Sequence, residues 1–209
     1  MKKIFLALAM FALFASSAFA QNVNFGVNIS YQSEGMVGDK DAVELFSDEQ
    51  VSSAFALGLN VRVPFNQMIS LRSGLDFQIN AYSYTYDDYG KDFDYMNLFL
   101  NLQLPVLARI NFTPGFFAEA GLDMQFNLLA QNYSEARDDF DMDDAWKDIE
   151  NWRVFQIGPT VGAGYTLWFG LEFSGRFSYG VLDSFTKGDI DMSPLRFQID
   201  ISYWFGYKK

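Results

Sequence analysis

The segment Asn22–Gln32, which reads NVNFGVNISYQ, alternates strictly between apolar and polar residues. Successive side chains of an extended strand point to opposite faces, so the apolar residues share one face and the polar residues the other. The apolar set is Val23, Phe25, Val27, Ile29 and Tyr31. The fold depends on whether this apolar face looks inward to a core or outward to surroundings that are as apolar as a core.

Seven further segments repeat the pattern, at residues 55–63, 69–81, 96–106, 116–128, 155–167, 171–181 and 195–207. No residue in the apolar phase of these segments is charged. The charges stand in the opposite phase, at Arg62, Arg72, Asp76, Glu119, Asp123, Glu172, Arg176, Arg196 and Asp200. The pattern therefore predicts eight antiparallel strands that keep their charges on one face.

The period alone also fits a soluble lipocalin-like barrel with the two faces exchanged. The polar phase, however, is nearly neutral, is rich in Gly, Asn, Gln, Ser and Thr, and lacks lysine, which suits a packed interior better than a solvent face. A strand of about 10–12 residues tilted by about 40° also spans roughly 25–30 Å, the height of the apolar band of a membrane barrel. We therefore expect an all-β protein, an eight-stranded antiparallel up-and-down transmembrane β-barrel whose apolar face meets lipid.

The connections between the segments alternate in length. Long acidic stretches at residues 34–52, 85–94, 130–151 and 183–194 alternate with short ones around 64–67, 113–115 and 168–170. Outer-membrane barrels have short periplasmic turns and longer extracellular loops. The alternation predicts a periplasmic N-terminus and acidic loops outside the cell.

The first twenty residues have the features of an export signal. Lys2 and Lys3 precede an apolar run from Ile4 to Ala15, and a site of small residues ends at Ala20. We expect cleavage there, leaving residues 21–209 as one barrel domain. Removal of the two lysines changes the net charge from -11 to -13, which argues against nucleic acid as a partner. The chain has no cysteine, so disulfides and thiol chemistry are excluded.

Three stretches resemble the PorT-like outer-membrane β-barrel family. They are YMNLFLNLQLPVLARINF (95–112), FFAEAGLDM (116–124) and FQIGPTVGAGYTLWFGLEFSGRFSYGVLD (155–183). The positions that match the family pattern are Leu104, Pro105 and Val106, then Gly121, then Gly162, Ala163, Gly164 and Tyr165, then Arg176, Phe177, Gly180 and Val181. Phe177 and Val181 stand where the family usually has Tyr and Leu. The resemblance implies an outer-membrane location and, for most members, no known activity.

The chain contains no histidine, so Ser-His-Asp chemistry lacks its general base. Five carboxylates in one lumen leave an all-carboxylate active site open as an alternative. The stronger interpretation is an interior ion-pair network, because the arginines of the same face supply partners and an eight-stranded barrel has just enough interior for its side chains. We predict no enzyme activity, and a cost of roughly 3–5 kcal/mol when one partner is removed.

The third long connection contains a spacing typical of calcium loops, with Asp139, Asp141, Asp143 and Glu150. Asp144 stands at the sixth position, where the calcium loop needs glycine for its sharp turn. A solvated acidic loop is the competing interpretation. Apart from this weak calcium hypothesis, the sequence indicates no cofactor.

Tyrosines cluster around the second long connection, at Tyr82, Tyr84, Tyr86, Tyr89 and Tyr95. Anchoring at the membrane interface and contacts to an extracellular ligand both use such residues. We predict a monomeric outer-membrane barrel, in contact with outer-membrane lipid, with a structural or surface-interaction role. The alternative is a transport or secretion-accessory component, either a narrow channel or a partner of secretion-machinery proteins.

Overall fold

The computed structural model describes residues 23–38, 52–88, 91–134, 146–148, 153–182 and 192–206. Within them, eight long strands and one short strand form a single antiparallel sheet. The long strands are β1 (Asn24–Gly38), β2 (Ser52–Pro64), β3 (Ile69–Asp88), β4 (Lys91–Asn111), β5 (Phe116–Ser134), β7 (Phe155–Thr166), β8 (Leu171–Tyr179) and β9 (Met192–Trp204), and the short β6 (Trp146–Asp148) pairs with the end of β5. No helix among the described residues is long and apolar enough to cross a membrane.

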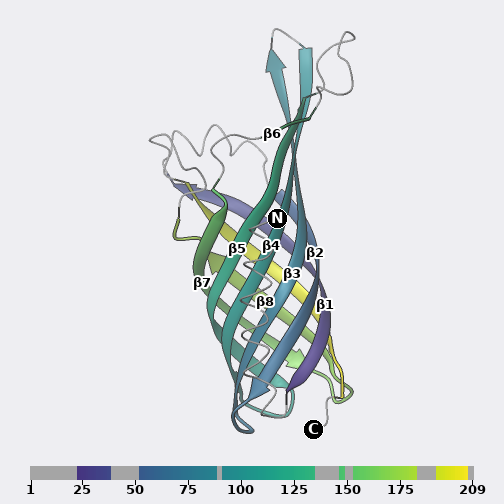
Figure 1. The fold of residues 1–209 in the computed structure, drawn as a ribbon, viewed down its shortest axis with the longest axis vertical. Coiled ribbons are helices and arrows are strands. Elements are labelled where there is room, and N and C mark those ends of the chain that lie inside the picture. Colours follow the sequence, from purple (N-terminus) through teal and green to yellow (C-terminus); the bar gives the residue numbers. More distant parts are fainter. Residues whose placement is uncertain are drawn as a thin grey trace.

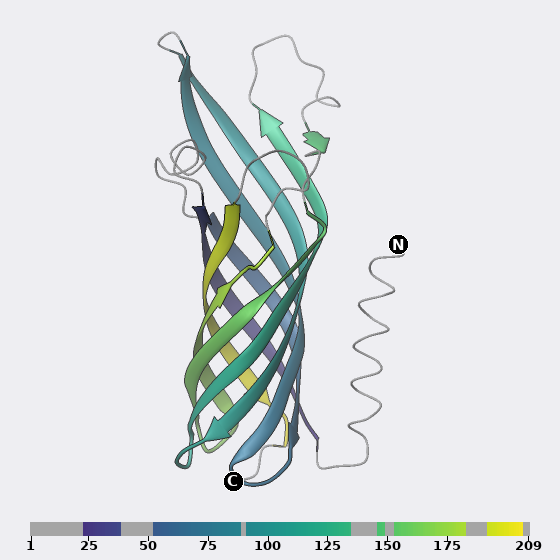
Figure 2. The same cartoon turned by 90° about the vertical axis from the view of Figure 1, so that its left-hand side faces the viewer.

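The eight long strands close into a barrel, as the sequence predicts. Each strand pairs with the next along the chain, and β9 returns to pair with β1. Following the paired residues once around the ring leads from Asn24 to Glu34, a displacement of ten residues along β1. For eight strands this displacement gives a tilt of about 40° and a backbone radius of roughly 8 Å, a bore that side chains fill. Figures 1 and 2 show the tilted strands around one axis.

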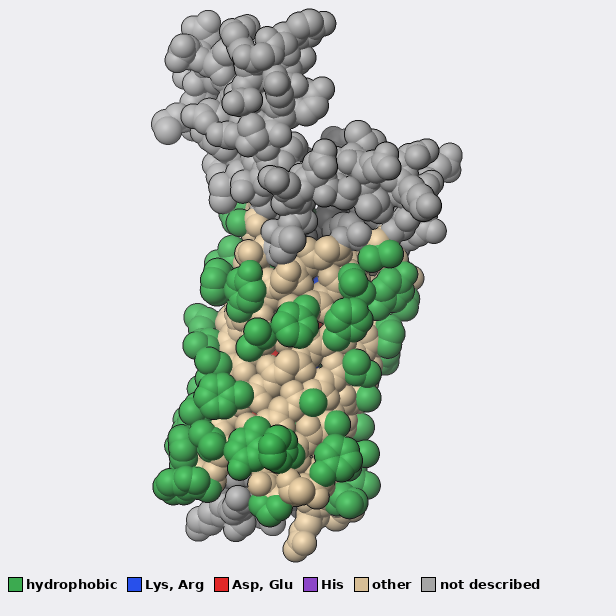
Figure 3. Space-filling model, turned by 180° about the vertical axis from the view of Figure 1, so that it is seen from behind, with side chains coloured by type: hydrophobic (Ala, Val, Ile, Leu, Met, Phe, Trp, Pro, Cys, Tyr) green, Lys and Arg blue, Asp and Glu red, His purple; other side chains and the backbone are tan. Residues whose placement is uncertain are grey.

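The apolar phase faces outward. Phe25, Ile29 and Leu57 are exposed, whereas Asn28, Ser30 and Gln32 between and beside them are buried. Figure 3 shows hydrophobic side chains distributed around the outside of the cylinder, with almost no charged atoms visible there. The barrel is therefore inverted relative to a soluble one, with a polar interior and an apolar exterior.

The two ends of the barrel differ. Short turns close one end between Pro64 and Ile69, Asn111 and Phe116, and Thr166 and Leu171. At the opposite end, β3 and β4 continue far beyond the barrel as one hairpin (Figure 1). This corrects the predicted loop at residues 85–94, because residues 85–88 and 91–94 are strand. The stretch is rich in Tyr, Thr and Phe, and these residues favour strands despite the acidic neighbours.

Pro105 lies inside β4, where a proline can interrupt the pairing of a strand. Pro105 lacks an N–H, yet β4 keeps one register with β3 on both sides of it. The hydroxyl of Ser73 on β3 donates a hydrogen bond of 2.9 Å to the carbonyl of Pro105. The register shift lies instead between β4 and β5, next to Leu100 and Asn101, where Leu128 is left without a partner.

Candidate functional site

The short-turn half of the lumen contains a cluster of three arginines and two glutamates. Arg109 lies at its centre, with Nη1 2.7 Å from Oε2 of Glu172 and Nη2 2.9 Å from Oε2 of Glu119. Arg72 binds Glu119 at 3.1 Å, and Arg62 binds Glu172 at 3.1 Å. These residues come from β2, β3, β4, β5 and β8, so the cluster joins opposite walls of the barrel. We call it the lower cluster.

Aromatic rings and a hydroxyl hold the lower cluster in place. The guanidinium carbon of Arg62 lies 3.9 Å from the ring centroid of Trp204, and that of Arg109 lies 3.6 Å from the ring centroid of Phe117. Such cation–π contacts strengthen when the groups are removed from water. Thr166 donates a hydrogen bond of 2.7 Å to Glu172. The arginine heads are thus fixed by both charge and stacking.

Further ion pairs lie toward the long-connection end of the lumen. Arg176 binds Asp200 through Nε at 2.9 Å and Nη2 at 2.8 Å, and its Nη2 lies 3.7 Å from Asp76. Two N–H groups on one carboxylate fix both distance and orientation. Arg196 binds Glu34 at 2.8 Å and also donates a hydrogen bond to Gln156.

All nine charged residues predicted for the interior are buried in the lumen. Eight of them form ion pairs with one another or with the two residues described next; Asp123 instead accepts a hydrogen bond of 2.6 Å from Gln103. Among the described residues, no arginine lies within 4.0 Å of Asp123.

Sequence reasoning missed two members of the network, Arg109 and Glu34. Arg109 continues the polar phase of its strand, but Pro105 and Leu107 interrupt that phase and hide the signal. Glu34 was assigned to the first long connection, whereas β1 continues to Gly38 and places Glu34 in the lumen. In both cases the strand continues beyond the last apolar residue that was assigned to it, and the missed charge lies in that continuation.

At the short-turn end the lumen opens into a cavity of about 1100 Å³. The lower cluster closes its inner end, because Arg62 and Thr166 are among the lining residues, and turn residues such as Asn66 and Thr113 form its rim. The chain therefore has a polar recess at one end and a network of charges across its axis.

The structure leaves the other predicted sites undecided. The calcium-like residues Asp139, Asp141, Asp143 and Glu150 lie outside the described residues, as do the side chains of the tyrosine cluster. Among the residues that are described, no group of three or more His, Cys, Asp or Glu side chains is arranged to hold a metal ion.

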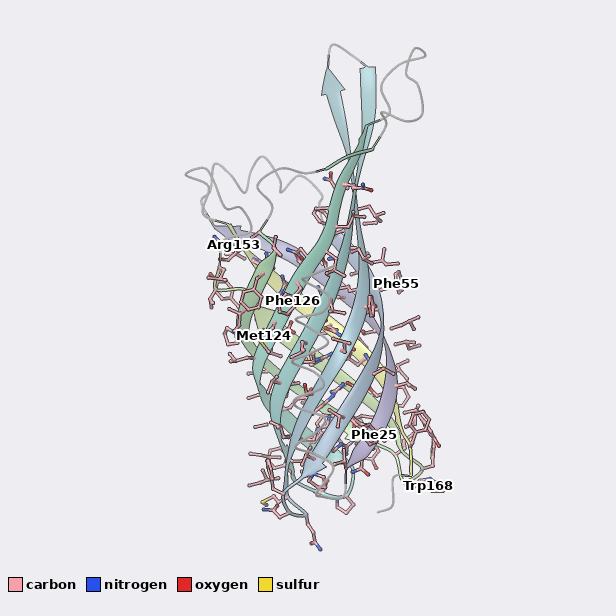
Figure 4. All side chains as sticks on the ribbon, viewed as in Figure 1. Phe25, Phe55, Met124, Phe126, Arg153 and Trp168 are labelled. Carbon is pink, nitrogen blue, oxygen red and sulfur yellow. The ribbon has the colours of Figure 1, made fainter. Side chains whose placement is uncertain are left out.

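Outward-pointing aromatic side chains surround this polar interior. In Figure 4, Phe55 and Trp168 project away from the barrel wall. Residues 16–186 match the family model described as outer membrane protein beta-barrel domain. The chain belongs to this family. An outer membrane protein beta-barrel domain resides in the bacterial outer membrane, where the exposed apolar band contacts lipid.

Solved structures of outer-membrane proteins are similar to this chain at low identity. Neisserial surface protein A is 10% identical over 88% of this chain and 99% of that chain, with a TM-score of 0.49. Ail of Yersinia pestis, in complex with the heparin analogue sucrose octasulfate, is 10% identical over 88% and 99%, with a TM-score of 0.48. The outer membrane enzyme PagL is 11% identical over 84% and 98%, with a TM-score of 0.40. No curated protein matches the chain.

Proposed function

We propose that this barrel is a closed structural or surface-interaction protein of the outer membrane. Its short turns and N-terminus face the periplasm, and its long connections carry the contacts to an extracellular ligand. The supporting observation is the lower cluster, in which Arg109 bridges glutamates of two different strands across the lumen. A bore of roughly 8 Å backbone radius that also holds this cluster has no continuous path for hydrated solutes.

The lower cluster resists opening because each of its two glutamates binds more than one arginine. Glu172 accepts from Arg62, Arg109 and Thr166, so displacement of one arginine would still leave it held by the others. Removing a charge from such a buried pair strands its partner in a medium of low polarity, which is costly. A state in which thermal motion has opened the lumen at the lower cluster is therefore rare.

Planar-bilayer recording of the purified, refolded chain tests the closed state. We expect no steady single-channel openings from the wild-type protein. The matched variant Arg109→Ala removes the central bridge and leaves Glu119 and Glu172 facing each other, so it should produce a measurable leak. Steady openings from the wild-type protein would contradict the proposal and favour a channel.

A transport or secretion-accessory role is the second candidate. The recess of about 1100 Å³ at the short-turn end favours it, since a periplasmic component could dock there. Co-purification from crosslinked cells, with wild type against the rim variant Gln67→Trp, tests this role: a partner that is captured by the first and lost with the second supports it.

The proposed role is non-enzymatic. The chain lacks histidine, and the lumen carboxylates closest to arginines already serve as their partners. The likeness to the enzyme PagL concerns the fold alone. The proposal on activity is tested with purified protein and outer-membrane lipid: an altered lipid species in mass spectra, abolished by Glu172→Gln, would reveal an enzyme.

A further inference from the structure

Three neighbouring strands carry pairs of amide side chains that face the lumen. Residues 78–80 read QIN on β3, residues 101–103 read NLQ on β4, and residues 125–127 read QFN on β5. The strand register sets these side chains beside one another, because Gln78 pairs with Asn101 and Gln103 pairs with Gln125. Two carboxylates, Asp76 and Asp123, continue the same surface toward the lower cluster.

Seven of these side chains have at least one buried oxygen that makes no hydrogen bond among the described residues, as do Gln32 and Asn60 on the neighbouring strands. All seven are at most 3% exposed. They are Asp76, Gln78, Asn80, Asn101, Gln103, Asp123 and Gln125, and we call them the amide wall. Buried polar atoms normally have partners, so seven orphaned acceptors on one surface need an explanation.

Exchanging the amide oxygen and nitrogen does not remove the orphaned oxygens of Gln103 and Gln125. The Nε2 of Gln103 already donates to Asp123 at 2.6 Å and to Gln198 at 3.3 Å. The Nε2 of Gln125 donates to Asn127 at 2.9 Å. These bonds fix the two amide nitrogens, so Oε1 of Gln103 and Oε1 of Gln125 remain acceptors that point at no donor.

The charge of the lumen is unbalanced at the same place. Five arginines and six carboxylates are buried among the described residues, which leaves one excess negative charge. The lower cluster has three arginines for two glutamates, so the deficit of positive charge lies toward the long-connection end. There Asp123 has no ion pair, and Asp76 has only Arg176 at 3.7 Å, whose Nη2 is already 2.8 Å from Asp200. An uncompensated buried charge is strongly unfavourable.

We propose that the amide wall binds one hard cation through its carboxylate and amide oxygens. Oxygen ligands of this kind suit Ca²⁺, and a ring of neutral carbonyl oxygens also replaces the hydration shell of an alkali cation. Bound water would supply hydrogens to the orphaned oxygens but no charge. A cation supplies both the contacts and the missing positive charge. The site is distinct from the calcium-like spacing of residues 139–150, and it does not depend on the role proposed above.

Two measurements on the refolded full barrel test the site. The background variant Asp139→Asn/Asp141→Asn/Asp143→Asn removes the calcium-like spacing, so that only the wall is probed. In the first, CaCl₂ is titrated into this protein by calorimetry. In the second, thermal unfolding is followed in NaCl, KCl and choline chloride at equal ionic strength. A bound cation stabilises the folded barrel in proportion to its occupancy.

Variants of the wall decide the result. Asp123→Asn keeps an acceptor for Gln103 and removes one charge, and Gln78→Met removes one oxygen at nearly constant length without changing charge. We expect each to weaken cation binding at least tenfold, and Gln78→Met remains informative if Asp123→Asn does not refold. Ser178→Ala, a buried lumen residue of β8 outside the wall, is the control and should bind as the background does.

If calorimetry detects heat of Ca²⁺ binding in the background protein and this heat is lost in the wall variants, the result supports a divalent site. Stabilisation by Na⁺ or K⁺ over choline that is lost in the same variants supports a monovalent site. If neither cation binds, or if binding is equal in background and wall variants, the proposal is wrong, and a proton and ordered water neutralise and solvate the wall.

Discussion

At the scale of single residues, the interior depends on buried ion pairs, in several of which one arginine binds two carboxylates. Arg109 is the extreme case, because it donates hydrogen bonds to both glutamates of the lower cluster and its guanidinium lies against the ring of Phe117. A buried charge that loses its partner cannot recover solvation, so loss of one member costs far more than a surface ion pair contributes. The consequence is testable one side chain at a time.

We expect Arg109→Met to lower the free energy of unfolding by about 3–5 kcal/mol, because Glu119 and Glu172 both lose a buried arginine partner and keep only Arg72 and Arg62. Arg109→Lys should lose less, since it keeps the charge but offers a single ammonium in place of a planar fork. Urea unfolding in lipid vesicles, followed by tryptophan fluorescence, measures both. A loss below about 1 kcal/mol for Arg109→Met would show that the glutamates are solvated rather than paired.

The contact between Arg109 and Glu172 also predicts that a second substitution partly offsets the first. Glu172→Gln in the Arg109→Met background removes the charge that had lost its contact with Arg109, so the double variant should be more stable than the sum of the two single changes implies. We expect a coupling free energy of about 1–3 kcal/mol between the two positions. The same double-mutant cycle between Arg109 and Ser178, which lies elsewhere in the lumen, should give a coupling near zero.

Nine lumen charges were predictable because a period of two assigns faces without any knowledge of the partner strand. Which charges pair was not predictable, because this depends on the displacement around the ring, which brings Arg196 of β9 to Glu34 of β1. Arg109 was missed for a local reason, since Leu107 breaks the polar phase two residues before it. In the sequence the amide wall is visible only as three short motifs. That these motifs lie side by side in the lumen follows from the strand register, which the sequence does not show.

At the scale of strands, length was the weakest prediction. Composition suggested that acidic residues end strands, yet β3 and β4 pair without interruption from Tyr82 and Asn97 to Asp88 and Lys91. The two strands of an antiparallel hairpin pair with each other along their facing edges, and water can satisfy the outer edges. The hairpin therefore does not have to end where the strands leave the bilayer. Turn positions at the opposite end were predicted well, because glycine at positive φ marks them, as Gly115 and Gly170 do.

Close contact between β4 and β5 gives a prediction for one glycine. A Cβ on Gly121 would lie 2.1 Å from the carbonyl oxygen of Val106, whereas a Cβ on Gly175 would meet nothing nearer than 3.9 Å. We expect Gly121→Ala to destabilise the barrel by roughly 1–3 kcal/mol relative to Gly175→Ala. The loss of glycine entropy in the unfolded chain is the same in both and cancels in the comparison. Heat-modifiable migration on detergent gels measures the folded fraction of each; equal folded fractions would contradict the close contact.

At the scale of the whole molecule, the barrel combines an apolar exterior with an interior that is sealed by charge. Closure of β1 on β9 leaves no unpaired long-strand edge within the barrel wall, which is the condition for strands to cross a bilayer. The ends then differ in what they offer: one presents short turns around a polar recess, and the other presents the extended β3–β4 hairpin. Any interaction with the outside of the cell depends on which end faces it.

The absence of cysteine makes this orientation directly measurable. Thr113→Cys places a thiol in an exposed short turn, and Ser184→Cys places one in the connection between β8 and β9. If the short turns are periplasmic, a membrane-impermeant maleimide added to intact cells should label Ser184→Cys, and it should label Thr113→Cys only after the outer membrane is permeabilised. Wild type supplies the unlabelled background. Labelling of Thr113→Cys on intact cells would invert the barrel, expose the recess at the cell surface, and transfer the ligand-binding proposal from the hairpin end to the short-turn end.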